Sequence, residues 1–128
     1  MVEDDPLVRD FVVDAFEFSI NRRIHTFDSG FTAWQYIQYA SPVHIVFADI
    51  HVPEMDGIEL TARIKATAPE IVCILASGNP TDASRAEAAG ADAFLLKPYG
   101  ISDLFALVQT FVADGGGRPG QSPPDNGR

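Results

Sequence analysis

The chain is poor in cysteine, in positive charge and in long hydrophobic runs. Cys73 is the single cysteine among 128 residues, so no internal disulfide can form and a reducing compartment fits. Lys and Arg number 9 against 18 Asp and Glu, a formal net charge of −9, and direct nucleic-acid binding is not expected because phosphate recognition needs a basic patch. The apolar runs fall far short of the ~20 residues that span a bilayer. The first residues are acidic, whereas a secretory signal begins with basic ones. We therefore expect a cytoplasmic protein with no membrane partner.

What the chain does contain is enough apolar material for a core. Hydrophobic residues make up 46% of the sequence, which suits one compact domain of this length. Residues 115–128 lack periodicity and are rich in Gly, Pro and polar residues. We therefore predict a folded domain over residues 1–114 and a flexible tail over residues 115–128.

Short apolar runs alternate with segments of helical periodicity. Residues 43–49, 71–76 and 93–96 form short apolar runs that are partly β-branched, and the first run ends in a carboxylate, Asp49. Such runs are typical of strands covered on both faces. Residues 23–27 alternate more and fit an edge strand. Apolar residues recur at helical spacing in five segments, 6–20, 30–38, 57–66, 80–89 and 101–112. This alternation predicts an α/β fold, with a parallel sheet and helices on both faces.

Polar residues follow the predicted strands. Asp49, Ser77 and Lys97 each stand where an apolar run ends, and Glu3 and Asp4 stand at the start of the chain. Since ligands of open α/β sheets bind beyond the carboxyl ends of the strands, we expect these residues at one edge. Converging carboxylates suit Mg²⁺, and a carboxylate can itself accept a phosphoryl group. A lysine and a hydroxyl provide the charge and the donor that such a group needs.

Four separate motifs carry a family resemblance. They are Glu3-Asp4-Asp5-Pro6, the D-x-x-x-P-x-M-D-G segment of residues 49–57, Ala76-Ser77-Gly78 and Lys97-Pro98. In order and spacing they resemble the receiver domain of two-component response regulators, over residues 1 to about 113. The resemblance implies a flavodoxin-like, doubly wound (βα)5 sandwich with a parallel five-stranded sheet of order 2-1-3-4-5. Because only Met1 and Val2 precede the acidic pair, the first strand is expected to be truncated.

The resemblance also implies a role for each motif residue. Asp49 is the expected phosphoacceptor, and its donor is the phosphohistidine of a sensor histidine kinase or a phosphotransfer protein. Mg²⁺ is the expected cofactor. The remaining roles are metal binding by Glu3, Asp4, Asp49 and the backbone carbonyl of His51, phosphoryl binding by Ser77 and Lys97, an aromatic switch at Phe94, and a cis peptide bond before Pro98.

The resemblance implies a signalling protein that catalyses only its own phosphorylation and dephosphorylation. Its output would be a downstream protein that binds the face of the fourth helix, fifth strand and fifth helix, or a homodimer. Two other hypotheses remain open. The truncated first strand would also suit a pseudo-receiver that binds proteins without phosphorylation. A metal-dependent phosphohydrolase is disfavoured, because His51 stands where such enzymes usually carry a second Asp.

Overall fold

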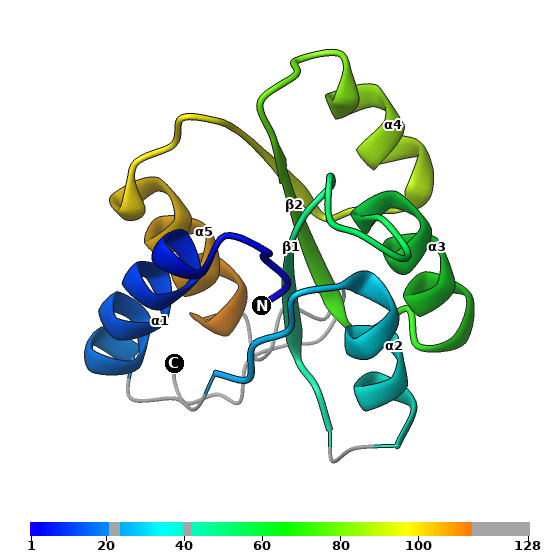
Figure 1. Cartoon of the computed structure of the whole chain (residues 1–128), viewed down its shortest axis with the longest axis horizontal. Coiled ribbons are helices and arrows are strands. Elements are labelled where there is room, and N and C mark those ends of the chain that lie inside the picture. Colours follow the sequence, from blue (N-terminus) through cyan, green and yellow to red (C-terminus); the bar gives the residue numbers. More distant parts are fainter. Residues whose placement is uncertain (21–23, 40–41, 114–128) are drawn as a thin grey trace.

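The computed structural model describes residues 1–20, 24–39 and 42–113, so the predicted tail lies outside the described residues. Helices and strands alternate from α2 onward (Figure 1). In chain order, the elements are α1 (Pro6–Ile20), α2 (Gly30–Tyr39), β1 (Ile45–Asp49), α3 (Gly57–Thr67), β2 (Val72–Ser77), α4 (Asp82–Ala89), β3 (Ala93–Leu96) and α5 (Ile101–Ala113). The five predicted helical segments and three of the predicted strands are therefore confirmed, within two residues at each end.

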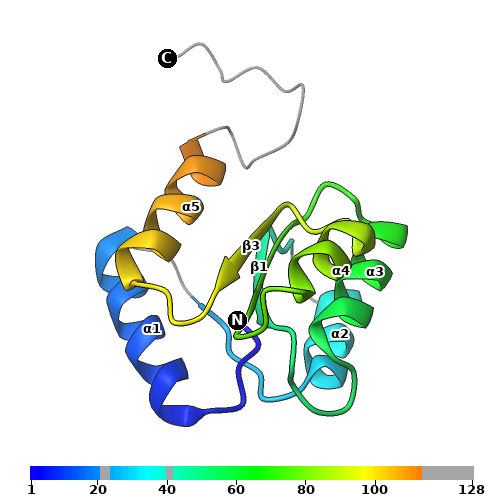
Figure 2. The ribbon, with the colours of Figure 1, turned by 90° about the horizontal axis from the view of Figure 1, so that it is seen from above.

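The three strands form a parallel sheet of order β1-β2-β3. Helices cover both faces, with α1 and α5 on one side and α2, α3 and α4 on the other (Figures 1 and 2). Successive side chains of a strand point to opposite faces, and β2 divides accordingly. Cys73 and Leu75 pack in the core beneath α2, α3 and α4, whereas Val72, Ile74 and Ala76 pack in the core shared with α1 and α5. The continuous apolar pattern of β2 thus reflects burial on both faces.

The first two positions of the expected five-stranded sheet are reduced to single bridges. Val2 forms parallel bridges with Phe27 on one side and Ala48 on the other. Its N–H donates to the Phe47 carbonyl at 2.8 Å, and its carbonyl accepts from the Asp49 N–H at 3.0 Å. The order 2-1-3-4-5 is preserved. The predicted edge strand covers residues 23–27, and among its described residues, 24–27, only Phe27 is bridged. Its partner is short, because the bridge is made by Val2 alone.

The connection after Asp49 is held tightly against the sheet. A Cβ on Gly57 would lie 2.9 Å from the Asp49 carbonyl oxygen, closer than side chains normally approach. Asp56 caps α3, since its side chain accepts from the Glu59 N–H at 2.9 Å. This packing places the start of α3 directly behind the end of β1.

Candidate functional site

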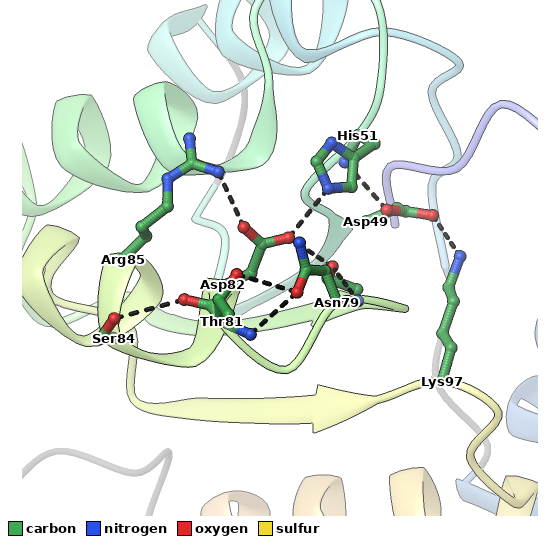
Figure 3. A network of polar contacts seen from close by, with 9 residues as sticks. Asp49, His51, Asn79, Thr81, Asp82, Ser84, Arg85 and Lys97 are labelled. Carbon is green, nitrogen blue, oxygen red and sulfur yellow. Dashed lines mark hydrogen bonds and ion pairs between the residues drawn. The ribbon is translucent and has the colours of Figure 1, made fainter.

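Three chemically active side chains lie at the carboxyl edge of the sheet. Asp49 ends β1, Ser77 ends β2, and Lys97 directly follows β3. Parallel strands present their carboxyl ends at the same edge, so residues 48 positions apart in the sequence come into contact here. Figure 3 shows Lys97 reaching Asp49 from the end of β3.

Asp49 is a buried carboxylate with both oxygens engaged. Its side chain is 9% exposed. Oδ2 accepts a hydrogen bond from the Lys97 ammonium, which also makes it an ion pair, and Oδ1 accepts from the backbone N–H of His51 at 2.9 Å. Burial lowers the pKa of Lys97, but the hydrogen bond and charge of Asp49, together with the charges of Glu3 and Asp4, outweigh burial and raise that pKa above its ordinary value. Lys97 is therefore a permanent cation beside Asp49.

Glu3 shares this cation with Asp49. Its Oε1 lies 3.9 Å from the Lys97 ammonium, and its Oε2 accepts from the Asp5 N–H at 3.1 Å. Burial raises the pKa of Glu3, and the negative charges of Asp49 and Asp4 add to that effect. Asp4 is itself exposed. The predicted acidic pair thus divides into a buried member and an exposed member at one edge of the site.

This donor set fits a hard divalent cation. Among the residues that the structure describes, no three His, Cys, Asp or Glu side chains converge tightly enough to hold a metal ion by themselves. Mg²⁺ does not require three, because it usually takes one or two carboxylates and keeps several waters. Glu3 and Asp49 offer carboxylates that share one ammonium, so this edge carries more negative than positive charge. The residues present therefore suit Mg²⁺ chemically.

Ser77 does not bond to Asp49. Its Oγ donates to Asp82 Oδ2 at 2.5 Å and accepts from the Asn79 N–H at 3.0 Å. Asp82, in the first turn of α4, also bonds to Arg85 at 2.8 Å through Oδ1. The hydrogen bonds from Ser77 and from the His51 ring hold the pKa of Asp82 down at about 2, so this side chain is a carboxylate at neutral pH.

His51 connects the hydrogen bonds around Asp49 with those around Asp82. Its ring Nε2 lies 2.9 Å from Asp82 Oδ2, and its side chain is 62% exposed. Because its backbone N–H bonds to Asp49, one residue touches both carboxylates (Figure 3). The family resemblance implied only a role for the backbone carbonyl of His51.

A sequence model of the response regulator receiver domain matches residues 1–109. The chain belongs to this family. Receiver domains interact with sensor histidine kinases and bind Mg²⁺ in their active site.

Individual relatives agree with this assignment. The response regulator Rre1 of Synechocystis sp. is 30% identical over 117 residues, which are 88% of this chain and 50% of that protein. The response regulator receiver protein CpdR of Brucella abortus is 35% identical over 120 residues, which are 88% of this chain and 93% of that protein. The chain thus spans about half the length of Rre1 and nearly all of CpdR.

Solved structures agree on the fold. The receiver domain of the sensor histidine kinase PA1611 from Pseudomonas aeruginosa PAO1 superposes with a TM-score of 0.75 at 24% identity, covering 88% of this chain and 93% of that one. That structure has a magnesium ion coordinated in its active-site cleft.

The remaining predicted positions of the receiver lie around the end of β3. The Lys97–Pro98 peptide bond is cis. Phe94 is half-buried, pairs in register with Leu75 on β2 and packs against the core beneath α3 and α4. It therefore lies on the strand next to β2, two residues before the position that pairs with Ser77.

Sequence reasoning missed Asp82. Its place after Pro80 and Thr81 indicates only an acidic residue in the first turn of a helix, a common and usually solvated position. The structure instead buries it, at 2% exposure. Nothing in the sequence announces this contact, because it depends on the path of the loop from Gly78 to Thr81.

Proposed function

We propose that this receiver accepts a phosphoryl group on Asp49 from the phosphohistidine of a sensor histidine kinase or a phosphotransfer protein. The observation that carries the proposal is the environment of Asp49: a buried carboxylate at the end of a central strand, with one oxygen on the Lys97 ammonium. An isolated carboxylate would avoid such burial. Here the Lys97 ammonium compensates the negative charge of the carboxylate, and a carboxylate oxygen can accept a phosphoryl group.

The proposed reaction moves a phosphoryl group from the donor histidine to Asp49. A carboxylate oxygen of Asp49 forms a bond to phosphorus while the bond from phosphorus to the donor histidine nitrogen breaks. Lys97 neutralises charge on the phosphoryl oxygens, and Ser77 donates a hydrogen bond to one of them. Glu3, Asp4, Asp49 and the His51 carbonyl would hold Mg²⁺, which would supply further positive charge for the transferred group. Attack by water on the same phosphorus breaks its bond to the Asp49 oxygen, releases inorganic phosphate and returns Asp49 to its carboxylate, so the domain also dephosphorylates itself.

The donor would dock beside α1. Leu7 and Phe11 are 81% and 62% exposed, which is unusual for large apolar side chains. They line a groove together with Lys97, Pro98 and Tyr99, so an apolar surface leads directly to the site. Serine at Leu7 or Phe11 should slow phosphotransfer from an autophosphorylated histidine kinase and leave modification by acetyl phosphate unchanged. Equal loss with both donors would refute this docking face.

The output face would be α4, β3 and α5. A phosphoryl group adds about −1.5 to −2 charges at Asp49, which draws Ser77 and Lys97 toward it and opens space beside Phe94. A downstream protein, or a second copy of the chain, would bind the altered face. Phe94→Ala should therefore change partner affinity while phosphorylation continues. With a formal charge of −9, this face is expected to bind protein and not nucleic acid.

Two further expectations concern the cellular location of the protein and the pseudo-receiver hypothesis. No helix in the described part of the chain is long and apolar enough to cross a membrane, and we place the receiver in the cytoplasm with its kinase. The pseudo-receiver hypothesis relied on a displaced acidic pair. Val2 pairs on both sides and Glu3 lies 3.9 Å from the Lys97 ammonium, and these contacts favour the phosphorylatable receiver over the pseudo-receiver.

Acetyl phosphate with Mg²⁺ tests the proposal directly. Intact mass should show one added phosphoryl group on the wild type and none on Asp49→Asn. The adduct should decay once acetyl phosphate is removed, and chelation of Mg²⁺ should block its formation. An unmodified wild type, or an equal adduct on Asp49→Asn, would overturn the proposal.

A further inference from the structure

The Ser77 hydroxyl is already committed to another acceptor. Ser77 is fully buried, and its one O–H points to Asp82 at 2.5 Å while the Asn79 N–H points to its oxygen. A hydroxyl has a single proton to donate. Ser77 therefore cannot bond to Asp82 and to a phosphoryl oxygen on Asp49 at the same time.

Asp82 is a strong competitor for that proton. It is buried at 2% exposure, and hydrogen bonds to an ionised acceptor are roughly twice as strong as neutral ones. It does not depend on Ser77 alone, because Arg85 bonds to Oδ1 at 2.8 Å and the His51 ring lies 2.9 Å from Oδ2 (Figure 3). The carboxylate would keep these two partners if Ser77 left, so the contact can open without an unpartnered buried anion.

We propose that Asp82 is a positioning residue that holds Ser77 away from Asp49 until a phosphoryl group draws the hydroxyl across. The inference rests on the proposed function, in which Ser77 serves that group. His51 ties the two ends together, since its backbone N–H bonds to Asp49 at 2.9 Å and its ring bonds to Asp82. Release of Ser77 would loosen the contact between β2 and the first turn of α4, which belongs to the proposed output face.

Beryllofluoride, a phosphoryl mimic, measures this competition in the whole chain. Its affinity in excess Mg²⁺ is measured by isothermal titration calorimetry. Asp82→Asn keeps the shape and removes the charge of the competing acceptor, so binding should tighten on the order of fivefold. Glu87→Gln, which removes one charge from the exposed face of the same helix, is the matched control and should bind like the wild type.

The decisive readout is the same substitution without the serine hydroxyl. In a Ser77→Ala background, Asp82→Asn should no longer change the affinity, because no hydroxyl remains to be released. An equal gain in both backgrounds would show that Asp82 acts only through its charge, and would overturn the inference. Circular dichroism checks the fold of each variant, and Asp82→Ala is the second variant if Asp82→Asn does not fold.

The experiments distinguish a failure of the inference about Asp82 from a failure of the proposed function. If acetyl phosphate modifies the wild type and Asp82→Asn leaves beryllofluoride affinity unchanged, the inference fails and the proposed function stands. If neither protein takes up a phosphoryl group, the proposed function fails and the inference fails with it.

Discussion

Replacing Lys97 by methionine should destabilise the domain in a way that reports the charge of the site. The ammonium lies 3.9 Å from Glu3 and is hydrogen-bonded to Asp49. Unit charges at about 4 Å attract by ~4 kcal/mol at an effective dielectric of ~20 and by ~1 kcal/mol in water. The Lys97 side chain is 34% exposed, so screening applies and its own desolvation subtracts from the attraction. We expect Lys97→Met to lower the free energy of unfolding at pH 7 by about 1–3 kcal/mol.

The loss should shrink as the pH falls. The pKa of Glu3 is raised mainly by burial, and Lys97 opposes that rise. Without the lysine, the pKa of Glu3 rises further, so the folded state binds this proton more tightly than the unfolded chain does. Stability then increases as the pH falls from neutral toward the ordinary pKa of Glu3, 4.5, because folding takes up a proton in that range. The difference between wild type and Lys97→Met should therefore be largest at pH 7 and smaller at pH 5.

Urea unfolding followed by circular dichroism, in EDTA, measures both effects. Arg63→Met is the matched control, because Arg63 forms an exposed i,i+4 pair with Glu59 on α3. It removes a positive charge away from the site and should cost about 0.3–0.5 kcal/mol. Lys97→Arg keeps the charge and should keep most of the stability. A loss in Lys97→Met that is as large at pH 5 as at pH 7 would refute the electrostatic reasoning, since lost packing alone would not depend on pH.

Three further predictions concern the framework of the site. Val2→Ala should lower the free energy of unfolding by about 1–3 kcal/mol in urea, because Val2 is 1% exposed in the core and loses two methyl groups; a loss below about 0.5 kcal/mol would contradict its role in the sheet. Gly30→Ala should prevent cooperative thermal unfolding or lower its midpoint markedly, because the new Cβ would meet the Met55 carbonyl oxygen at 1.7 Å, and a native-like midpoint would show that this loop yields easily. Burial raises the pKa of Cys73 to about 12, so at pH 8 only on the order of one thiol in ten thousand is ionised, against about a quarter for a free cysteine. Ellman's reagent should therefore react slowly with Cys73 in the native protein and rapidly in denaturant. A fast reaction with the native protein would refute this burial.

Most of the fold follows from local pattern. The strands 45–49 and 72–77 are apolar up to their last residues, Asp49 and Ser77, because both faces are buried, and that feature is visible in the sequence. The two bridges at Val2 show what the local sequence pattern does not predict, namely how far a strand extends. A strand needs a run of paired residues on both partners, and neither Met1-Val2 nor the described residues 24–27 provide one. The order of the sheet could be predicted, whereas the extent of its first two members depended on tertiary pairing.

The candidate site divides in the same way. Asp49 and Lys97 could be brought together from the sequence because each follows a strand, and parallel strands place their ends at one edge. The state of Ser77 could not, since the position of its hydroxyl depends on a carboxylate five residues later and on the turn between them. Hydrogen bonds across an irregular loop have no period, so neither spacing nor composition indicates them.

The resting site is therefore asymmetric in charge and in hydrogen bonding. One ammonium faces the carboxylates of Asp49 and Glu3, and Asp4 adds negative charge at the exposed side. A phosphoryl group would add further negative charge to this edge, which Lys97 alone cannot balance. Cation binding and the release of Ser77 would both compensate this excess of negative charge. The cation would add positive charge, and the Ser77 hydroxyl would donate a hydrogen bond to a phosphoryl oxygen. If both responses depend on that excess, Asp82→Asn should reduce the concentration of Mg²⁺ needed for half-maximal beryllofluoride binding. The Ser77 hydroxyl, no longer held by a carboxylate, would then stabilise part of the negative charge that Mg²⁺ otherwise neutralises.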